Sequence, residues 1–398
     1  MKYSVYQHWD PLRVCLVGRS YSPEFYHFIK NERVRTVMER IARETEEDYQ
    51  KLITLLESFG VKILRPDLTD DYRDYMFGGG KIHPPPMTPR DYSCMLGKDF
   101  FFKTTDATEK WNVRRGADWP ENMPTTQDEF LQFECADNIK KEIAEFLIAE
   151  NVIPSLAEVF TVPPQYTIWS KVLNELSQHT NIITQSKIKS CDHLNSAGFT
   201  RVGKDIYLGT EYQDEDNSVK AAELSRNFSE YRWHSVNTGG HSDGTYCPVV
   251  PGLIVSLKDI QTYAETFPGW EVIYLPDQSW DKISPFLELK MKNSGKWWVP
   301  GEELNDDFTN FVEEWLGHWV GFVEETVFDV NMLVIDRHNV VCNNYNKEVF
   351  EAFERHGVTP HVINFRHRYF WDGGLHCITS DIHREGTMQD YFPERATK

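Results

Sequence analysis

The residues that could perform chemistry gather around one cysteine near the C-terminus of this 398-residue chain. Cys377 follows His376 in the segment DGGLHCITSDIHREG, where Gly373 and Gly374 let the backbone turn and approach other groups closely. A polar setting with a nearby histidine is one in which a thiol can ionise to a nucleophilic thiolate. Most free cysteines are buried structural residues, so the residue type alone does not indicate catalysis.

A second polar cluster, in the segment GGHSDGT, contains His241 and Asp243. In an extended segment residues i and i+2 point to the same side, so we expect both side chains to face one cavity. The alternative is that His241 is a turn or capping residue of a glycine-rich loop. A thiol, a histidine base and several carboxylates suit a planar cation such as guanidinium, which carboxylates bind through paired charge-assisted hydrogen bonds. Because carboxylates raise the pKa of a thiol, the thiolate would need the positive charge of that cation.

A repeated structural unit must position these residues. Residues 331–365 contain two apolar runs around a polar turn, then a helical pattern that ends in glycine, then a further strand pattern. Residues 245–275 repeat this order. No such unit buries its apolar face alone, so we expect pseudo-symmetric packing around a centre. The predicted elements are strands at 13–18, 61–66, 245–250, 252–257 and 271–275, helices near 31–58 and at 259–266, and strand pairs in DYSCMLGKDFFFKTT and FTRVGKDIYLGTE.

Polar residues stand directly ahead of several predicted strand pairs. Since equivalent ends of repeated units should converge in space, we expect a central polar site built from distant segments. Cys377 is expected to enter this site after the last strand, on a loop that the scaffold positions. The polar residues concerned are Asp91, Asn195, His241, Asp243, Glu325 and Asp329.

Composition and charge limit the classes of function that this protein can have. A net charge of −19 argues against binding to nucleic acid or to an anionic membrane, because phosphate contacts need clustered lysines and arginines. The start of the chain lacks the pattern of a secretory signal, and nowhere do 18 apolar residues stand together, so a cytoplasmic location is expected. The seven cysteines are spread singly, which predicts reduced thiols. We expect one domain over residues 1–398.

A metal site is an alternative interpretation of the C-terminal histidines. The spacings are loose, and two adjacent residues are poorly placed to bind one ion together. The sequence therefore favours a site without metal or organic cofactor. The candidate ligands would be His361, His367, His376, Cys377 and His383.

Several motifs, in order along nearly the whole chain, resemble those of the glycine (arginine) amidinotransferase family of guanidine-modifying enzymes. They are HWDPLRVCLVGR, MTPRD, RVGKDIY, HSDGT followed by PGLIVS, NMLVID, and GGLHCITSDIHREGTMQDY. The resemblance implies the pentein fold, an α/β propeller of five ββαβ-type modules around a central active site. By motif position it implies that Cys377 is the nucleophile and His241 the general acid/base, and that Asp91 and Asp243 hold the guanidinium.

Two positions depart from the family pattern. Asn195 stands where the family has the aspartate of its catalytic triad, and Asp192 could replace it if the loop aligns differently. An asparagine can still orient a histidine but does not stabilise an imidazolium by charge. Ile260 stands where the family has an arginine that binds the carboxylate of the donor, and Lys258 is the nearest cation.

The resemblance predicts an amidinotransferase that moves the amidino group from L-arginine, or a related guanidine donor, to a primary amine through an amidino-cysteine intermediate. One alternative is a guanidine hydrolase of the same superfamily, such as an arginine deiminase or dihydrolase, in which water replaces the amine. A second alternative is an inactive protein that binds guanidinium. The family also implies a homodimer, and the covalent mechanism requires no metal or organic cofactor.

Overall fold

The computed structural model describes most of the chain. Of the predicted site residues, Asn195 and Ile260 lie outside the described part, and so do Glu325 and Asp329. The described residues are 2–68, 84–91, 93–102, 115–149, 152, 169–183, 196–210, 222, 224–238, 241–257, 263–275, 297–317, 320 and 330–397.

Five three-stranded sheets share one topology. In each sheet the central strand pairs antiparallel with one neighbour and parallel with the other. The repeated unit predicted from the sequence is thus confirmed. With the central strand in the middle, the sheets are β15 (Thr379–Arg384), β1 (Leu12–Val17) and β2 (Lys62–Leu64); β3 (Ser93–Leu96), β4 (Asp99–Phe102) and β5 (Asn181–Ile183); β6 (Phe199–Val202), β7 (Asp205–Thr210) and β8 (Arg232–Asn237); β9 (Tyr246–Val250), β10 (Leu253–Ser256) and β11 (Glu271–Tyr274); and β12 (Leu333–Asp336), β13 (Asn339–Cys342) and β14 (Thr359–Val362).

Tight turns at glycine join two of the antiparallel pairs. Gly97, between β3 and β4, and Gly203, between β6 and β7, have φ angles of 56° and 66°. This left-handed region costs glycine little because it has no Cβ. A Cβ at Gly203 would also lie 2.1 Å from the backbone oxygen of Gln389, so the C-terminal segment packs directly on this turn.

The position of the last strand corrects one prediction. Cys377 was expected to follow the last strand, but β15 begins two residues after it and pairs antiparallel with β1. The strand escaped prediction because its sequence, TSDIHR, is mostly polar, although all six residues are buried. The two ends of the chain therefore complete one sheet, with Cys377 at its edge.

A buried ion cluster explains how a polar strand can lie in the interior. Asp381 of β15 accepts hydrogen bonds from the guanidinium groups of Arg90, Arg201 and Arg384, at 2.7 to 3.1 Å. All four side chains are 1% exposed or less. These arginines outweigh the effect of burial and hold the pKa of Asp381 well below its usual range. The cluster links β15 to β6, which carries Arg201, and to the segment of Arg90 and Asp91.

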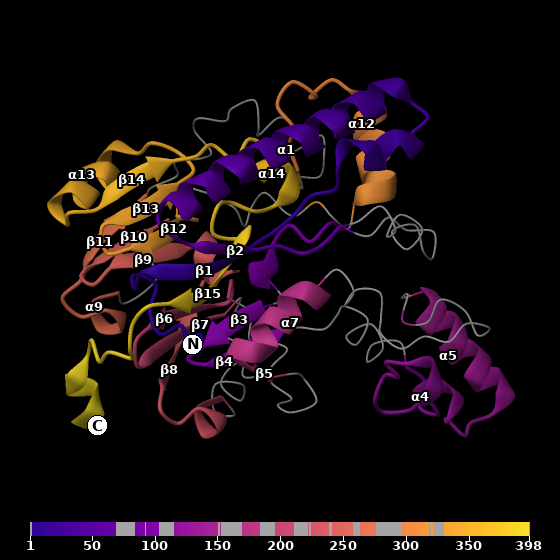
Figure 1. Cartoon of the computed structure of the whole chain (residues 1–398), viewed down its shortest axis with the longest axis horizontal. Coiled ribbons are helices and arrows are strands. Elements are labelled where there is room, and N and C mark those ends of the chain that lie inside the picture. Colours follow the sequence, from indigo (N-terminus) through magenta and orange to yellow (C-terminus); the bar gives the residue numbers. More distant parts are fainter. Residues whose placement is uncertain are drawn as a thin grey trace. The chain divides into compact units, whose positions relative to one another are not determined.

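Helix α1 (Glu32–Ser58) is the longest helix and lies where the apolar spacing predicted it. Asn31 caps its first turn by accepting from the backbone N–H of Arg33 and Val34. In Figure 1 its C-terminal end reaches the sheet of β1 and β2, which it contacts. The other helices are α4 (Gln127–Leu131), α5 (Asp137–Ala149), α7 (Ser170–His179), α9 (Tyr263–Thr266), α12 (Asp306–Phe311), α13 (Lys347–Arg355) and α14 (Arg368–Trp371), with shorter turns η1 (Pro23–Phe28), η4 (Pro89–Asp91), η6 (Ser242–Gly244), η7 (Val312–Leu316) and η9 (Pro393–Thr397).

The chain divides into two compact units. The first comprises Met1–Arg65, Pro85–Lys103 and Leu176–Lys398 and contains all five sheets. The second comprises Pro66–Pro84 and Thr104–Glu175 and has its own apolar cluster around Phe130 and Leu147. A single domain over residues 1–398 stays a prediction.

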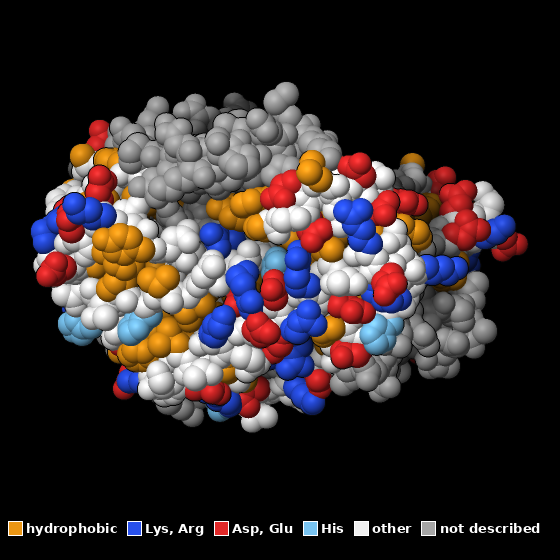
Figure 2. All heavy atoms as spheres, turned by 90° about the horizontal axis from the view of Figure 1, so that it is seen from above, with side chains coloured by type: hydrophobic (Ala, Val, Ile, Leu, Met, Phe, Trp, Pro, Cys, Tyr) orange, Lys and Arg blue, Asp and Glu red, His pale blue; other side chains and the backbone are white. Residues whose placement is uncertain are grey.

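The surface carries charges of both signs. On the face shown in Figure 2, lysine and arginine side chains lie among aspartates and glutamates. None of the helices in the described ranges combines the length and the apolar character that a membrane span requires.

Candidate active site

Cys377 is buried in a short connection between α14 and β15. Asp372 ends α14 in a left-handed conformation, with φ of 52°. A Cβ added to Gly373 would lie 3.0 Å from Cγ2 of Thr88 and 3.3 Å from Cβ of Cys377. A larger residue there would crowd both side chains, so glycine suits the close packing around the thiol.

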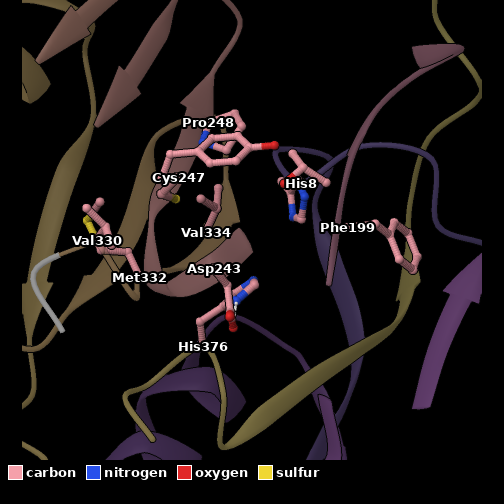
Figure 3. A pocket seen from close by; sticks show the side chains of 11 residues that line it. His8, Phe199, Asp243, Cys247, Pro248, Val330, Met332, Val334 and His376 are labelled. Atoms are coloured by element: carbon pink, nitrogen blue, oxygen red, sulfur yellow. Dashed lines mark hydrogen bonds and ion pairs between the residues drawn. The ribbon is translucent and has the colours of Figure 1, made fainter. Parts of the chain in front are cut away.

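Asp243 lies against the thiol. Its Oδ2 accepts from Sγ of Cys377 at 3.4 Å and from Nδ1 of His376 at 2.8 Å. Figure 3 shows His376 and Asp243 pointing toward each other. The other oxygen, Oδ1, is buried and has no hydrogen-bond partner among the described residues. An unsatisfied buried carboxylate oxygen beside a thiol is a binding position for a cationic N–H donor.

The local structure around His241 differs from the prediction. Residues Ser242–Gly244 form the 3-10 turn η6 instead of an extended segment, and His241 stands at the start of that turn. As a result the side chain of His241 is 41% exposed, whereas that of Asp243 is 6% exposed. Even so, Nδ1 of His241 lies 3.9 Å from Oδ1 of Asp91, so the histidine remains beside a candidate carboxylate.

Asp91 is fixed by its neighbour in the turn η4. Nε of Arg90 donates to the backbone oxygens of His376 and Thr379, each at 2.8 Å. The two acceptors lie on either side of the thiol, one residue before Cys377 and two residues after it. The turn that carries Asp91 is therefore tied directly to the segment that carries Cys377.

The two carboxylates differ in the direction in which their pKa is shifted. The pKa of Asp91 is raised to about 6, chiefly by burial of the carboxylate and also by the charge of Asp243, while His241 opposes the shift. Burial would also raise the pKa of Asp243, but the hydrogen bond from His376 and the positive charges around it hold that pKa below its usual value. At neutral pH the site is accordingly anionic and suited to a cation.

The thiol and its neighbouring histidine are both neutral at rest. Burial raises the pKa of the Cys377 thiol well above its usual value, and Asp243 and Asp91 raise it further. Burial and the charge of Arg90 lower the pKa of His376 to about 4. The imidazole is thus neutral near pH 7, with its Nδ1–H donating to Asp243.

The structure brings together four of the five predicted site residues. Cys377 contacts Asp243, His241 lies beside Asp91, and the charge of Asp243 acts on Asp91, so residues from three of the repeated units share one electrostatic environment. The fifth, Asn195, lies outside the described residues, so its place as the third triad member stays a prediction.

Asn331 is a site residue that the sequence reasoning missed. It is buried, and its amide nitrogen donates to Sγ of Cys377 at 3.0 Å. It stands directly ahead of a predicted strand pair, as Asp91 does ahead of another. That position in the sequence indicates a site residue, as it does for the acidic Glu325 and Asp329 a few residues earlier.

The histidines considered as metal ligands contact different partners. Nε2 of His361 lies 2.9 Å from Asn339, and Nε2 of His367 lies 2.6 Å from Glu44. His383 lies against the backbone of Ser4. Among the described residues, no three His, Cys, Asp or Glu side chains form a group that could hold a metal ion.

A small cavity lies behind Asp243 and His376, with a volume of about 10 Å³. His8, Met332 and Val334 are among the residues that line it, as Figure 3 shows. This is the volume of roughly one water molecule. The exposed side of the site is that of His241 and Asp91, whose side chains are 41% and 31% exposed.

Comparison with known proteins relates this arrangement to a group of transferases. No family model matches the sequence. Glycine amidinotransferase, mitochondrial, of Xenopus tropicalis is 21% identical over 411 residues, which cover 97% of this chain and 84% of that protein. L-arginine:L-lysine amidinotransferase of Pseudomonas savastanoi pv. phaseolicola is 24% identical over 204 residues, which cover 50% of this chain and 46% of that protein.

Solved structures establish the fold. SxtG, an amidinotransferase from Microseira wollei in the saxitoxin biosynthetic pathway, superposes with a TM-score of 0.58 and 16% identity, covering 98% of this chain and 99% of that one. Inosamine-phosphate amidinotransferase StrB1 from Streptomyces griseus gives a TM-score of 0.55, also at 16% identity and with the same coverage. The chain therefore resembles the amidinotransferases along nearly its whole length, and it adopts the pentein fold that the motifs predicted.

Proposed function

We propose that this protein is an amidinotransferase that moves the amidino group of L-arginine to a primary amine through a covalent amidino-cysteine. The relatives along the chain are named as amidinotransferases, and one of their names specifies L-arginine and L-lysine. These names support the reaction class and an arginine donor. The acceptor amine of this protein is a matter for experiment.

One observation carries the proposal at the site. Asp243 directs one carboxylate oxygen at the thiol of Cys377, and its other, buried oxygen has no hydrogen-bond partner within the described part of the chain. A guanidinium group offers several N–H donors in one plane, so it can satisfy this oxygen while its central carbon faces the thiol. Asp91, beside His241, supplies a second carboxylate for the same cation.

The first half-reaction forms the covalent intermediate. The cation offsets the two carboxylates that raise the thiol pKa, so the thiol can ionise in the complex. Sulfur bonds to the central carbon of the guanidinium, and the bond from that carbon to the side-chain nitrogen of arginine breaks. The thiol proton passes through His241 to the leaving nitrogen, which departs as the amine of ornithine.

The second half-reaction reverses these roles. A primary amine attacks the amidino carbon, His241 accepts a proton from the amine, and the carbon–sulfur bond breaks. Sulfur regains its proton, and the product is a new guanidine. Each half-reaction transfers one amidino group and one proton, so no external oxidant or reductant is needed.

Product analysis with L-arginine tests the reaction class. The proposal predicts that ornithine accumulates beyond one equivalent of protein only when an amine acceptor such as glycine or lysine is added, and that one new guanidine then forms for each further ornithine. Citrulline, ammonia or urea formed without an acceptor would instead establish a hydrolase. Arginine binding without any product would establish a guanidinium-binding protein. A homodimer and a cytoplasmic location stay predictions.

A further inference from the structure

Asn331 occupies a rigid position beside the thiol. Its neighbours Val330 and Met332 are both buried in the apolar core. Its backbone oxygen accepts from Nδ2 of Asn343 at 2.9 Å. The main chain at Asn331 is therefore fixed on both sides, and its amide cannot move away from the site without disturbing the core.

The Asn331 amide uses all of its hydrogen-bonding capacity. Oδ1 accepts from the backbone N–H of His376 at 2.9 Å and of Cys377 at 3.1 Å. Nδ2 donates to the backbone oxygen of Asp243 at 3.2 Å and to Sγ of Cys377 at 3.0 Å. Because backbone N–H groups can only donate, Oδ1 must face them, and this requirement sets the amide orientation. The Nδ2 group must therefore be the one that faces Sγ of Cys377.

The groups around sulfur oppose one another. Asp243 and Asp91 disfavour the thiolate, whereas the hydrogen bonds from Asn331 and from the backbone of Gly374 favour it. His376, which donates to Asp243, is neutral near pH 7, and His241 faces Asp91. Asn331 is therefore the side chain that donates a hydrogen bond to sulfur in this network of described residues.

We propose that Asn331 is a catalytic residue, whose amide N–H stabilises the Cys377 thiolate while its carbonyl oxygen fixes the backbone that presents it. The inference rests on the proposed function only in taking Cys377 as the nucleophile. The N–H keeps its bond to sulfur when the thiol ionises and again when the carbon–sulfur bond breaks. A charge-assisted hydrogen bond of this kind is stronger than the one made to the neutral thiol.

The test measures the reactivity of the thiol without any substrate. The rate at which iodoacetamide alkylates Cys377 is followed against pH, by mass spectrometry of the peptide that contains it. Asn331→Asp keeps the shape and the acceptor oxygen but replaces the N–H donor with a second acceptor. We expect its alkylation profile to move to higher pH by about one unit or more, a fall of about tenfold in rate at a given pH. Asn331→Ser, which is smaller and uncharged, should move the profile in the same direction.

Asn346→Ala is the matched control. Asn346 caps α13 in the same repeated unit by accepting from the backbone N–H of Val349, so its loss should lower stability and leave the alkylation profile unchanged. If folded Asn331→Asp and Asn331→Ser proteins kept the wild-type profile, the proposed role would be wrong. If the profiles shift while wild-type protein makes no ornithine from arginine, the role of Asn331 stands and the proposed function falls.

Discussion

At the scale of residues, Asp243 is the group on which the chemistry depends. It contacts the thiol and His376 through one oxygen, and the other, which none of the residues that the structure describes contacts by a hydrogen bond, can accept from a cation. The same negative charge that binds the donor disfavours the thiolate. Binding of a cation and activation of the thiol are therefore coupled at one side chain.

Asp243→Asn tests this coupling. Without the charge, arginine should bind about 10- to 100-fold more weakly, the loss expected for a hydrogen bond to a charged group. The thiol of Cys377 should at the same time become easier to ionise, because Asp243 raises its pKa. Calorimetry with arginine and the alkylation profile measure the two effects.

Asp336→Asn provides the matched control, since Asp336 stands at the end of β12 and accepts from His338 and Asn339. This substitution should change neither the affinity for arginine nor the alkylation profile of Cys377. Unchanged arginine affinity in Asp243→Asn would contradict the assignment of this carboxylate to the donor.

Asp91 predicts a pH dependence of donor binding. Its pKa in the folded protein is about 6, raised above that of the unfolded chain, so the folded state favours its protonated form. The stability that this preference contributes is present at acid pH and is lost as the pH rises from about 4 to 6. The affinity for the donor should show the opposite pH dependence, because the donor cation binds the ionised form of Asp91.

Arginine affinity should accordingly rise as the pH increases from about 5 to 7. In Asp91→Asn this rise should be reduced, and affinity should be lower at pH 7. Calorimetric titrations of wild-type and Asp91→Asn protein with arginine at several pH values measure this difference in affinity. An equally steep rise in Asp91→Asn would assign the pH dependence to another group.

At the scale of elements, sequence reasoning located most of the scaffold. Apolar runs around tight turns predicted the strand pairs β3–β4, β6–β7, β9–β10 and β12–β13, and helical spacing predicted α1 and α13. These signals are local, so the sequence displays them. Asp91 and His241 both stand ahead of such pairs, and in the structure Nδ1 of His241 lies 3.9 Å from Oδ1 of Asp91.

The features that escaped prediction depend on distant partners. β15 carries the polar residues Asp381, His383 and Arg384. Its burial is energetically possible because arginines from other segments neutralise the charge of Asp381. Asn331 has no charge or nucleophilic atom to draw attention, and its role follows from the backbone groups that surround it. η6 replaced the predicted extended segment, because GGHSDGT has little side-chain signal to distinguish a turn from a strand.

The ion cluster of β15 makes a prediction about stability. Asp381→Asn leaves buried guanidinium groups without their anion, which should lower the free energy of unfolding by about 3–5 kcal/mol. The folded pKa of Asp381 lies below its unfolded value, so its contribution is present above about pH 4 and is lost as the pH falls.

Urea denaturation at pH 7 measures the effect. Glu385→Gln, which removes the exposed ion pair with Arg13 at the end of the same strand, is the control and should change stability by less than about 1 kcal/mol. Equal stability of the two variants would show that the buried cluster does not hold β15 in place.

At the scale of the whole molecule, the two ends of the chain close one sheet. β1 begins at Leu12 and β15 ends at Arg384, and they pair along their lengths. Because Cys377 precedes β15 directly, the thiol is held by a strand whose partners come from the start of the chain. Folding of the site therefore depends on contacts across almost the full sequence.

A single domain predicts one cooperative unfolding transition. Circular dichroism and tryptophan fluorescence should then give the same midpoint in urea. The second compact unit, Pro66–Pro84 with Thr104–Glu175, has its own apolar cluster, so the alternative is a separate transition for that unit. Two transitions with different midpoints would overturn the expectation of one domain over residues 1–398.

The central claim is that Cys377 carries the amidino group, and intact mass after mixing with L-arginine in the absence of acceptor tests it most directly. Wild-type protein should gain about 42 Da, one amidino group, and release one equivalent of ornithine. Cys377→Ser should gain no mass while still binding arginine, and addition of a competent amine should remove the adduct from wild-type protein. Ornithine formation by Cys377→Ser at a rate near that of wild type, or a stable adduct on another residue, would contradict the account.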